Sequence, residues 1–395
     1  MTRPDFKQEA QALFDDMVAL RRDFHMHPEL GFQEHRTSGI VADTLAGLGM
    51  EVQRGVGQTG VVGLLEGAKP GPVVMMRFDM DALPIQEESD IPYASQNPGV
   101  MHACGHDGHT AMGLTLARIM TKYQDQIAGT LKFVFQPAEE GLGGAFAMIA
   151  DGVLENPRPD VAFAMHVWTA TPYGKVRVRS GPVMASSSVF SITVQGRGGH
   201  GAAPHQANDP ILAAAHIVTA LQSIVSRNTN PQDSVVVSIG QFSAGTTFNV
   251  IPDKAMLKGT VRSYNEELHR QTYRRILEMA VNMATAFSCE AHMETLAIVA
   301  AVNNAEEPTT AVYDAAAHVM GEENILDERT MASEDMGYML EEVPGCYFFV
   351  GGQNEELGFD YPHHHPKFNF DERALVDGVA VMANAAANYV MKNNA

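Results

Sequence analysis

Cysteines and basic residues are scarce in this sequence, and each scarcity excludes a class of protein. Only three cysteines occur among 395 residues, at positions 104, 289 and 346. They are too few and too scattered for a disulfide scaffold, so we expect a reducing, cytoplasmic setting. Lys and Arg number 27 against 47 Asp and Glu, a formal net charge of −20. Binding to nucleic-acid phosphates or to an anionic membrane surface needs clustered cations, so neither partner is expected.

Long hydrophobic runs are also lacking. No uninterrupted apolar stretch approaches the roughly 18 residues of a membrane-spanning helix, and the polar opening MTRPDFKQEA does not resemble a signal peptide. We find no short-period repeat and no low-complexity tract. With 45% hydrophobic residues the chain can still bury a substantial core, so we expect a soluble protein of two or three domains.

Strands alternate with helices in the first part of the chain and again near its end. Almost wholly apolar runs predict strands covered on both faces, and apolar residues at helical spacing predict helices between them. The predicted strands are 60–65, 72–79, 131–135, 161–165 and 345–350, and the predicted helices are 5–24, 37–48, 106–123, 145–150, 309–320 and 372–391. This alternation is typical of an α/β fold with a mixed, largely parallel sheet flanked by helices.

The middle of the chain interrupts this alternation. The predicted elements there are strand 186–195, helix 209–226, strands 234–239 and 255–261, helix 266–287 and strand 292–299. Their order predicts a small α+β sandwich inserted into the larger domain. We therefore expect a catalytic domain in two parts, 1–183 and 299–395, separated by a lid domain at 184–298.

Cys104 and His106 are the first candidates for metal binding. They stand one glycine apart in a loop before a helix, and a thiolate beside an imidazole is a good pair of ligands for Zn²⁺ or a similar ion. A Cys/His catalytic dyad is less suitable, because two residues so close on a turn leave little room to orient a base. Taken alone, the pair is as compatible with a buried structural cysteine.

Three further loops favour the metal interpretation. Glu139, Glu140 and His166 follow two of the predicted strands, at the edge where open α/β sheets place their ligand crevice. A histidine run at 363–365 lies on a proline-bounded loop before the final helix. Four loops that bring Cys, His and Glu to one edge are difficult to explain by coincidence.

Each of these residues also has an ordinary structural interpretation. Paired glutamates often begin a solvated helix, a lone histidine such as His166 is more often a core residue, and a histidine run can be a surface loop. Asp79 and Asp81 could bind metal, orient a ligand or bond the following turn, with the orienting role favoured for Asp81. His102 and His109 are assigned no role, because either could face solvent or cap the helix.

Six motifs run through most of the chain in a fixed order. They are RFDMDALPI from Arg77, MHACGHDGHT from Met101, FQPAEEG from Phe135, GGHGAAPH from Gly198, FNVIP from Phe248 and HHPKF from His364. Together they resemble the amidohydrolase branch of the aminoacylase and carboxypeptidase G metallopeptidase family. That branch includes hippurate hydrolases and hydrolases of indole-acetyl amino acids.

The resemblance implies a binuclear site for two divalent ions, Zn, Mn, Co or Ni. The implied ligands are Cys104, His106, Glu140, His166 and His364. Glu139 is the implied general acid and base, which accepts a proton from the metal-activated water and gives it to the departing amine. Other branches have a His-x-Asp ligand motif where this chain has Asp79-Met-Asp81, a departure typical of the Cys-Gly-His branch.

The resemblance also implies roles for residues of the inserted domain. His200 would reach into the partner subunit's site and stabilise the developing oxyanion, which implies a homodimer or higher oligomer formed through the lid domain. Without the resemblance, its loop could simply expose histidines. Asn249 and Arg262 match positions that hold the substrate carboxylate, which an arginine fork suits, although Arg262 could equally form a strand-end ion pair.

We therefore predict an enzyme that hydrolyses N-acyl amino acids, with an acetyl, benzoyl or other aromatic acyl group, to a carboxylic acid and a free amino acid. Two alternatives stay open. One is a metallo-dipeptidase on the same scaffold, and the other is a non-catalytic metal-binding or thiol-redox protein. The acyl group, the amino acid and the native metal do not follow from the sequence, because several first-row ions suit these ligands.

Overall fold

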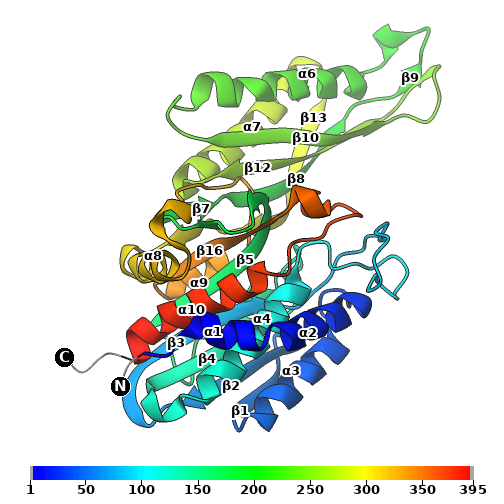
Figure 1. Ribbon diagram of the computed structural model, residues 1–395. Coiled ribbons are helices and arrows are strands. Elements are labelled where there is room, and N and C mark those ends of the chain that lie inside the picture. Colours follow the sequence, from blue (N-terminus) through cyan, green and yellow to red (C-terminus); the bar gives the residue numbers. More distant parts are fainter. Residues whose placement is uncertain (1–2, 392–395) are drawn as a thin grey trace. The chain divides into compact units, whose positions relative to one another are not determined.

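The structure is a computed structural model that describes residues 3–391 (Figure 1). The chain folds into two compact units. Unit 1 comprises the residues up to Val183, then Asn303–Arg329, and the chain from Asp335 onward. Unit 2 comprises Met184–Val302 and Thr330–Glu334. The predicted insertion was 184–298, so unit 2 extends further along the chain and adds a short segment that is remote in sequence.

Unit 1 is built on an eight-stranded mixed sheet with the order β1-β2-β4-β3-β5-β16-β6-β15. Its central strands β4, β3, β5 and β16 pair in parallel, whereas β1, β2 and β6 make the antiparallel pairs. The strands are β1 (Glu51–Val56), β2 (Gly60–Glu66), β3 (Lys69–Asp79), β4 (Ala128–Gln136), β5 (Val161–Pro172), β6 (Val176–Arg177), β15 (Ile325–Leu326) and β16 (Gly345–Gln353). The predicted mixed, largely parallel sheet is confirmed.

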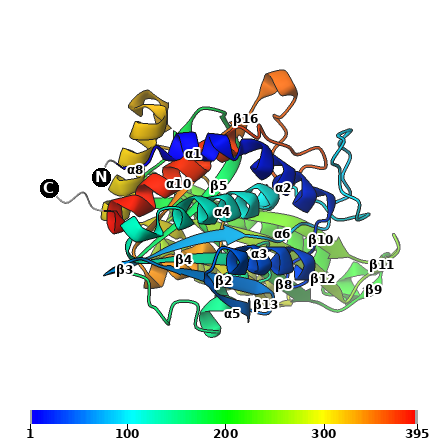
Figure 2. The same cartoon turned by 60° about the horizontal axis from the view of Figure 1, so that its bottom comes forward.

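Helices cover both faces of this sheet. α4 (His106–Thr121) and α10 (Ala374–Val390) are buried along most of their length and share a core with Phe78, Phe133 and Phe163. Figure 2 shows them with α1 and α2 on one side of β3 and β4. Alternate residues such as Arg77 point to the other face, where α5 and α9 contact β4 and β5. The remaining bounds are α1 (Phe6–Ala12), α2 (Phe14–Met26), α3 (His35–Gly47), α5 (Gly144–Ala150), α8 (Glu306–Met320) and α9 (Met336–Glu342).

Three elements of unit 1 differ from the predictions, each for a physical reason. The helix predicted at 5–24 is two helices that meet at Leu13, whose φ of −105° and ψ of 10° are not helical. β1 was not predicted, because all of its residues except Val56 are at least partly exposed. β5 continues beyond its predicted end to Pro172, because β16 pairs with it that far. His166 therefore lies inside a strand and not in the loop after it.

Unit 2 is a four-stranded antiparallel sheet with the order β10-β12-β8-β13, and α6 and α7 pack on it. Along the chain the elements are β8 (Ser186–Gln195), α6 (Pro210–Ser223), β10 (Val235–Ala244), β12 (Lys254–Ser263), α7 (Glu266–Ala286) and β13 (Glu290–Val299). This is the predicted order of strands and helices. Two short strands, β9 (Gly199–His200) and β11 (Val250–Ile251), pair with each other. The chain crosses between the units at β7 (Gly181–Met184) and at β14 (Val302–Asn304), and these two short strands pair with each other.

One helix in the described part of the chain, Pro210–Asn228, is long and apolar enough to cross a membrane by length and composition alone. It comprises α6 and the π-helical turn that follows. Ala213, Ile217 and Leu221 on one of its faces belong to the core of unit 2. Core helices of soluble proteins meet the same criterion, so the helix carries no membrane assignment.

Candidate metal centre

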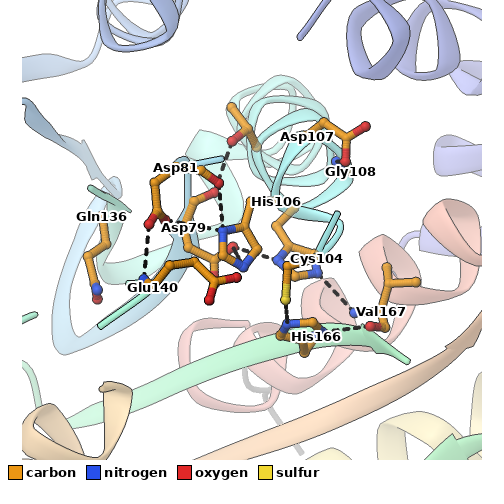
Figure 3. A network of polar contacts seen from close by, with 12 residues as sticks. Asp79, Asp81, Cys104, His106, Asp107, Gly108, Gln136, Glu140, His166 and Val167 are labelled. Atoms are coloured by element: carbon orange, nitrogen blue, oxygen red, sulfur yellow. Dashed lines mark hydrogen bonds and ion pairs between the residues drawn. The ribbon is translucent and has the colours of Figure 1, made fainter. Parts of the chain in front are cut away.

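The side chains predicted to bind metal all lie in unit 1, and they converge. Figure 3 shows Cys104, His106, Glu140 and His166. Three overlapping groups have ligand atoms within 4.8 Å of one another: Cys104 with His106 and His166, Cys104 with Glu140 and His364, and His106 with Glu139 and Glu140. Cys104, His106 and Glu140 each belong to two groups. Overlapping groups of this kind suit two neighbouring metal ions that share some of their ligands.

Separate segments of the chain bring these side chains together. Gly105, whose φ of 97° is strongly disfavoured for other residues, turns the chain between Cys104 and the start of α4 at His106. The backbone N–H of His364 donates to the carbonyl oxygen of Ala103 at 2.8 Å, which ties the histidine run to the cysteine loop. Local turns and one long-range hydrogen bond therefore place ligands that are remote in sequence.

Hydrogen bonds determine which ring nitrogen two of the histidines offer to a metal. Nδ1 of His106 donates to the carbonyl oxygen of Asp81 at 2.9 Å, and Nδ1 of His166 donates to the carbonyl oxygen of Val167 at 2.6 Å. A carbonyl only accepts, so Nδ1 carries the proton in both rings and Nε2 is left as the ligand atom. Nε2 of His166 lies 3.4 Å from Sγ of Cys104.

The donor set fits a divalent metal ion. Nε2 of His106 is buried and has no hydrogen-bond partner among the described residues, which is costly unless a cation binds it. Burial, reinforced by Glu140 and Glu139, raises the pKa of the Cys104 thiol well above its usual value. Such a thiol is protonated at neutral pH unless a cation displaces the proton, which argues against a thiol-redox role. Nε2 of His364 lies 3.2 Å from Oε1 of Glu140, close enough for both to reach one ion.

Two aspartates, Asp79 at the end of β3 and Asp81 shortly after it, form hydrogen bonds around the predicted ligands. Oδ1 of Asp81 lies 3.2 Å from Nδ1 of His106, and its Oδ2 accepts the backbone N–H of Glu140 at 3.0 Å. These are the contacts of an orienting carboxylate. Nη1 of Arg77 donates to Oδ2 of Asp79 at 2.6 Å. Burial opposes ionisation of Asp79, but His106, His109 and Arg77 outweigh it and keep its pKa well below the usual range.

His102 and His109, to which the sequence assigned no role, do not face solvent. Both rings are buried. Nδ1 of His109 donates to Asp79 at 2.5 Å, and its Nε2 accepts the backbone N–H of Val167 at 2.9 Å. Both ring nitrogens are thus occupied, so His109 supports the strand that carries His166. The sequence could have indicated that His109 lies close to His106, because residues three apart share one helix face and His109 stands three residues after His106.

His200, Asn249 and Arg262 belong to unit 2. His200 pairs with Val250 between the short strands β9 and β11, and both His200 and Asn249 are exposed. Nη1 of Arg262 donates to the carbonyl oxygen of Met331 at 2.9 Å, so part of its guanidinium is used within unit 2. The predicted roles of these three residues in binding an oxyanion or a carboxylate stay predictions.

The chain is similar to known proteins in both sequence and structure. The model of the peptidase family M20/M25/M40 matches residues 75–388. Hippurate hydrolase of Campylobacter jejuni is 41% identical over 94% of this chain and 96% of its own length. N-acetyl-L-cysteine deacetylase of Bacillus subtilis is 36% identical over 95% and 89%. The YxeP protein of Bacillus subtilis, described as a dinuclear metal binding peptidase from the M20 family, has a TM-score of 0.80 and 32% identity, covering 96% of this chain and 98% of that one.

Proposed function

This chain belongs to the peptidase family M20/M25/M40 and is an amidohydrolase, and we propose on that premise that it cleaves N-acyl amino acids to a carboxylic acid and a free amino acid. Two of its relatives are named for substrates of this class, hippurate and N-acetyl-L-cysteine. The observation that carries the proposal is the placement of Glu139 beside the ligands, within 4.8 Å of His106 and Glu140. A site that only stores metal has no need of an adjacent base.

In the proposed mechanism two divalent ions, of Zn, Mn, Co or Ni, would be held by Cys104, His106, Glu140, His166 and His364. When bound, such ions lower the pKa of water and polarise an amide carbonyl. Glu139 accepts the proton of the attacking water and delivers it to the departing amine. Asp81 keeps His106 and the backbone of Glu140 in place while this proton moves.

We also propose that unit 2 is the lid and the surface through which two copies pair. Its helix α6 has no charged residue, and Ile211 and Leu212 on it are 39% and 48% exposed. The adjacent strand β10 is an uncharged sheet edge, which is usually paired or covered in native proteins. A cytoplasmic location remains a proposal, supported by three buried, free cysteines.

Matched substrate pairs test the proposed function. Metal-loaded protein should hydrolyse N-acetyl, N-benzoyl or N-indoleacetyl amino acids and should leave dipeptides with a free α-amine largely intact. Preference for the dipeptides would support the dipeptidase alternative. No hydrolysis with any of the four metals, together with free alkylation of Cys104, would support the metal-binding or thiol-redox alternative.

Replacement of the proposed base gives a sharper test. Glu139→Gln should lower kcat by about 10²- to 10⁴-fold, because the amide cannot accept a proton. Its metal content should remain close to that of the wild type, since Glu139 is not among the proposed ligands. Glu356→Gln, at an exposed glutamate, is the matched control. Near-normal turnover by Glu139→Gln would refute the assigned role.

A further inference from the structure

A buried glutamate from the N-terminal part of unit 1 holds the turn that carries Glu139. Glu34 is completely buried and stands directly before α3. Its Oε1 accepts the backbone N–H of Ala138 at 2.9 Å, and its Oε2 accepts a hydrogen bond from the hydroxyl of Thr59. Ala138 immediately precedes Glu139, so this carboxylate is one residue away from the proposed base along the chain.

The backbone at Ala138 needs such support. Its φ of 54° lies in the left-handed region, which is sterically strained for a residue with a side chain. The carbonyl oxygen of Ala138 accepts the N–H of Gly144 at 3.0 Å, so hydrogen bonds hold this residue on both sides. The turn directs the chain from the end of β4 at Gln136 into Glu139.

The segment Leu30–Glu34, here called the buttress segment, also packs against this turn. A Cβ on Gly31 would lie only 3.0 Å from Cα of Ala138, so the two backbones are in close contact. Leu30 forms a parallel bridge with Ala82, the residue after Asp81. The buttress segment therefore joins the turns after β3 and β4, which carry the orienting aspartate and the proposed base.

We propose that Glu34 is a positioning residue for amide hydrolysis, acting through the Ala138 turn on the carboxylate of Glu139. The proposal rests on the proposed function of Glu139. Loss of the hydrogen bond would let the Ala138 peptide rotate, and a displacement of about 1 Å of a catalytic group can cost about 10²-fold in rate. A negative charge is not needed for this role, because an amide oxygen can accept the same N–H. Burial raises the pKa of Glu34 and already disfavours its charged form.

Kinetics of paired variants test the proposal. Glu34→Ala should lower kcat by about 10- to 100-fold while KM changes by less than about threefold. Glu34→Gln should stay within about threefold of the wild type, because its amide oxygen replaces the acceptor. In a Glu139→Gln background, Glu34→Ala should cause little further loss, since its effect passes through the missing base. A normal kcat for Glu34→Ala, or a full additional loss in the double variant, would overturn the proposal.

A measurement without substrate separates this proposal from the proposed function. Hydrogen exchange of the Ala138 amide, in the metal-loaded full chain, should become at least about tenfold faster in Glu34→Ala and remain near wild type in Glu34→Gln. If the wild type hydrolyses no N-acyl amino acid, the function fails while this exchange still decides the role of Glu34. If Glu34→Ala does not fold, Thr59→Val, which removes only the hydroxyl contact, should give a smaller acceleration. Unchanged exchange in the folded variant would refute the role.

Discussion

Single residues in unit 1 show how charge is tolerated in a buried setting. The guanidinium of Arg21 is completely buried and donates to Asp107 at 2.9 Å, to Glu372 at 3.0 Å and to Asn369 at 2.9 Å. Buried charges persist where pairing and hydrogen bonding are this complete. Asp107 lies between His106 and Gly108 at the start of α4 (Figure 3), so the network anchors the helix that carries a predicted ligand.

His25, which joins this network, should make folding stability depend on pH. Burial opposes its charged form, but Asp107 at 2.7 Å and Glu87 at 3.3 Å outweigh burial and raise its pKa. A raised pKa in the folded state gives stabilisation that is complete below the unfolded value of about 6.5 and is lost as pH rises through the folded value. The difference in unfolding free energy between wild type and His25→Gln should therefore shrink as the pH is raised above about 6.5.

Urea unfolding across this pH range measures the effect. His318→Gln, at an exposed histidine of α8, is the matched control. A difference for His25→Gln that is constant across the range would contradict the pairing of His25 with the two carboxylates.

Two helical glycines lie in different surroundings. A Cβ on Gly113 of α4 would lie 2.7 Å from Phe78 and 2.8 Å from Phe135, whereas a Cβ on Gly39 of α3 would meet nothing within 4 Å. Gly113 thus allows α4 to lie directly on β3 and β4. The close approach places the start of α4, with the predicted ligand His106, at the ends of those strands.

Alanine substitutions at the two glycines should have opposite effects. Gly113→Ala should destabilise the fold by about 1–3 kcal/mol through overpacking. Gly39→Ala should stabilise it by about 0.5–1 kcal/mol, because alanine loses less backbone entropy in a helix. Denaturant unfolding of both variants measures the free energies, and a neutral or stabilising effect of Gly113→Ala would argue against the close packing of α4.

The net charge of the whole molecule affects how fast a charged substrate approaches it. The formal net charge of −20 slows the approach of an anion such as an N-acyl amino acid. Binding of the proposed substrate would then depend on local cations, namely the two proposed metal ions and Arg262 in its predicted role. The proposed action of His200 in a partner subunit adds a requirement for two copies of the chain.

Complementation between inactive subunits tests that requirement. His200→Ala and Glu139→Gln should each be inactive, but in a mixed dimer one site combines an intact Glu139 with an intact His200 from the other subunit. Random mixing of equal amounts should restore about one quarter of wild-type activity, because half of the dimers are mixed and each has one complete site. No recovery in verified mixed dimers would contradict action across subunits. Leu212→Arg, on the exposed face of α6, should yield monomers in light scattering and abolish the recovery.

Much of the fold and part of the site could be predicted without coordinates. The strand and helix order of unit 2 and the mixed sheet of unit 1 follow from apolar periodicity, which is a local property. The convergence of Cys104, His106 and Glu140 was expected because parallel strands end at one edge. The break at Leu13 and the extension of β5 were missed, since packing and strand pairing decide where an element ends.

The sequence by itself determined the fold class and the types of residue predicted to bind metal, because these depend on neighbouring residues and on strand direction. Only the tertiary structure decided that His166 lies inside β5, which ring nitrogens of His106 and His166 carry the proton, that His109 is buried against Asp79, and that Glu34 supports the turn before Glu139. Glu34 and Ala138 are separated by 104 positions, and no local pattern connects them. Such contacts form only when the chain closes on itself, because burial leaves each backbone N–H and carboxylate to find a partner nearby.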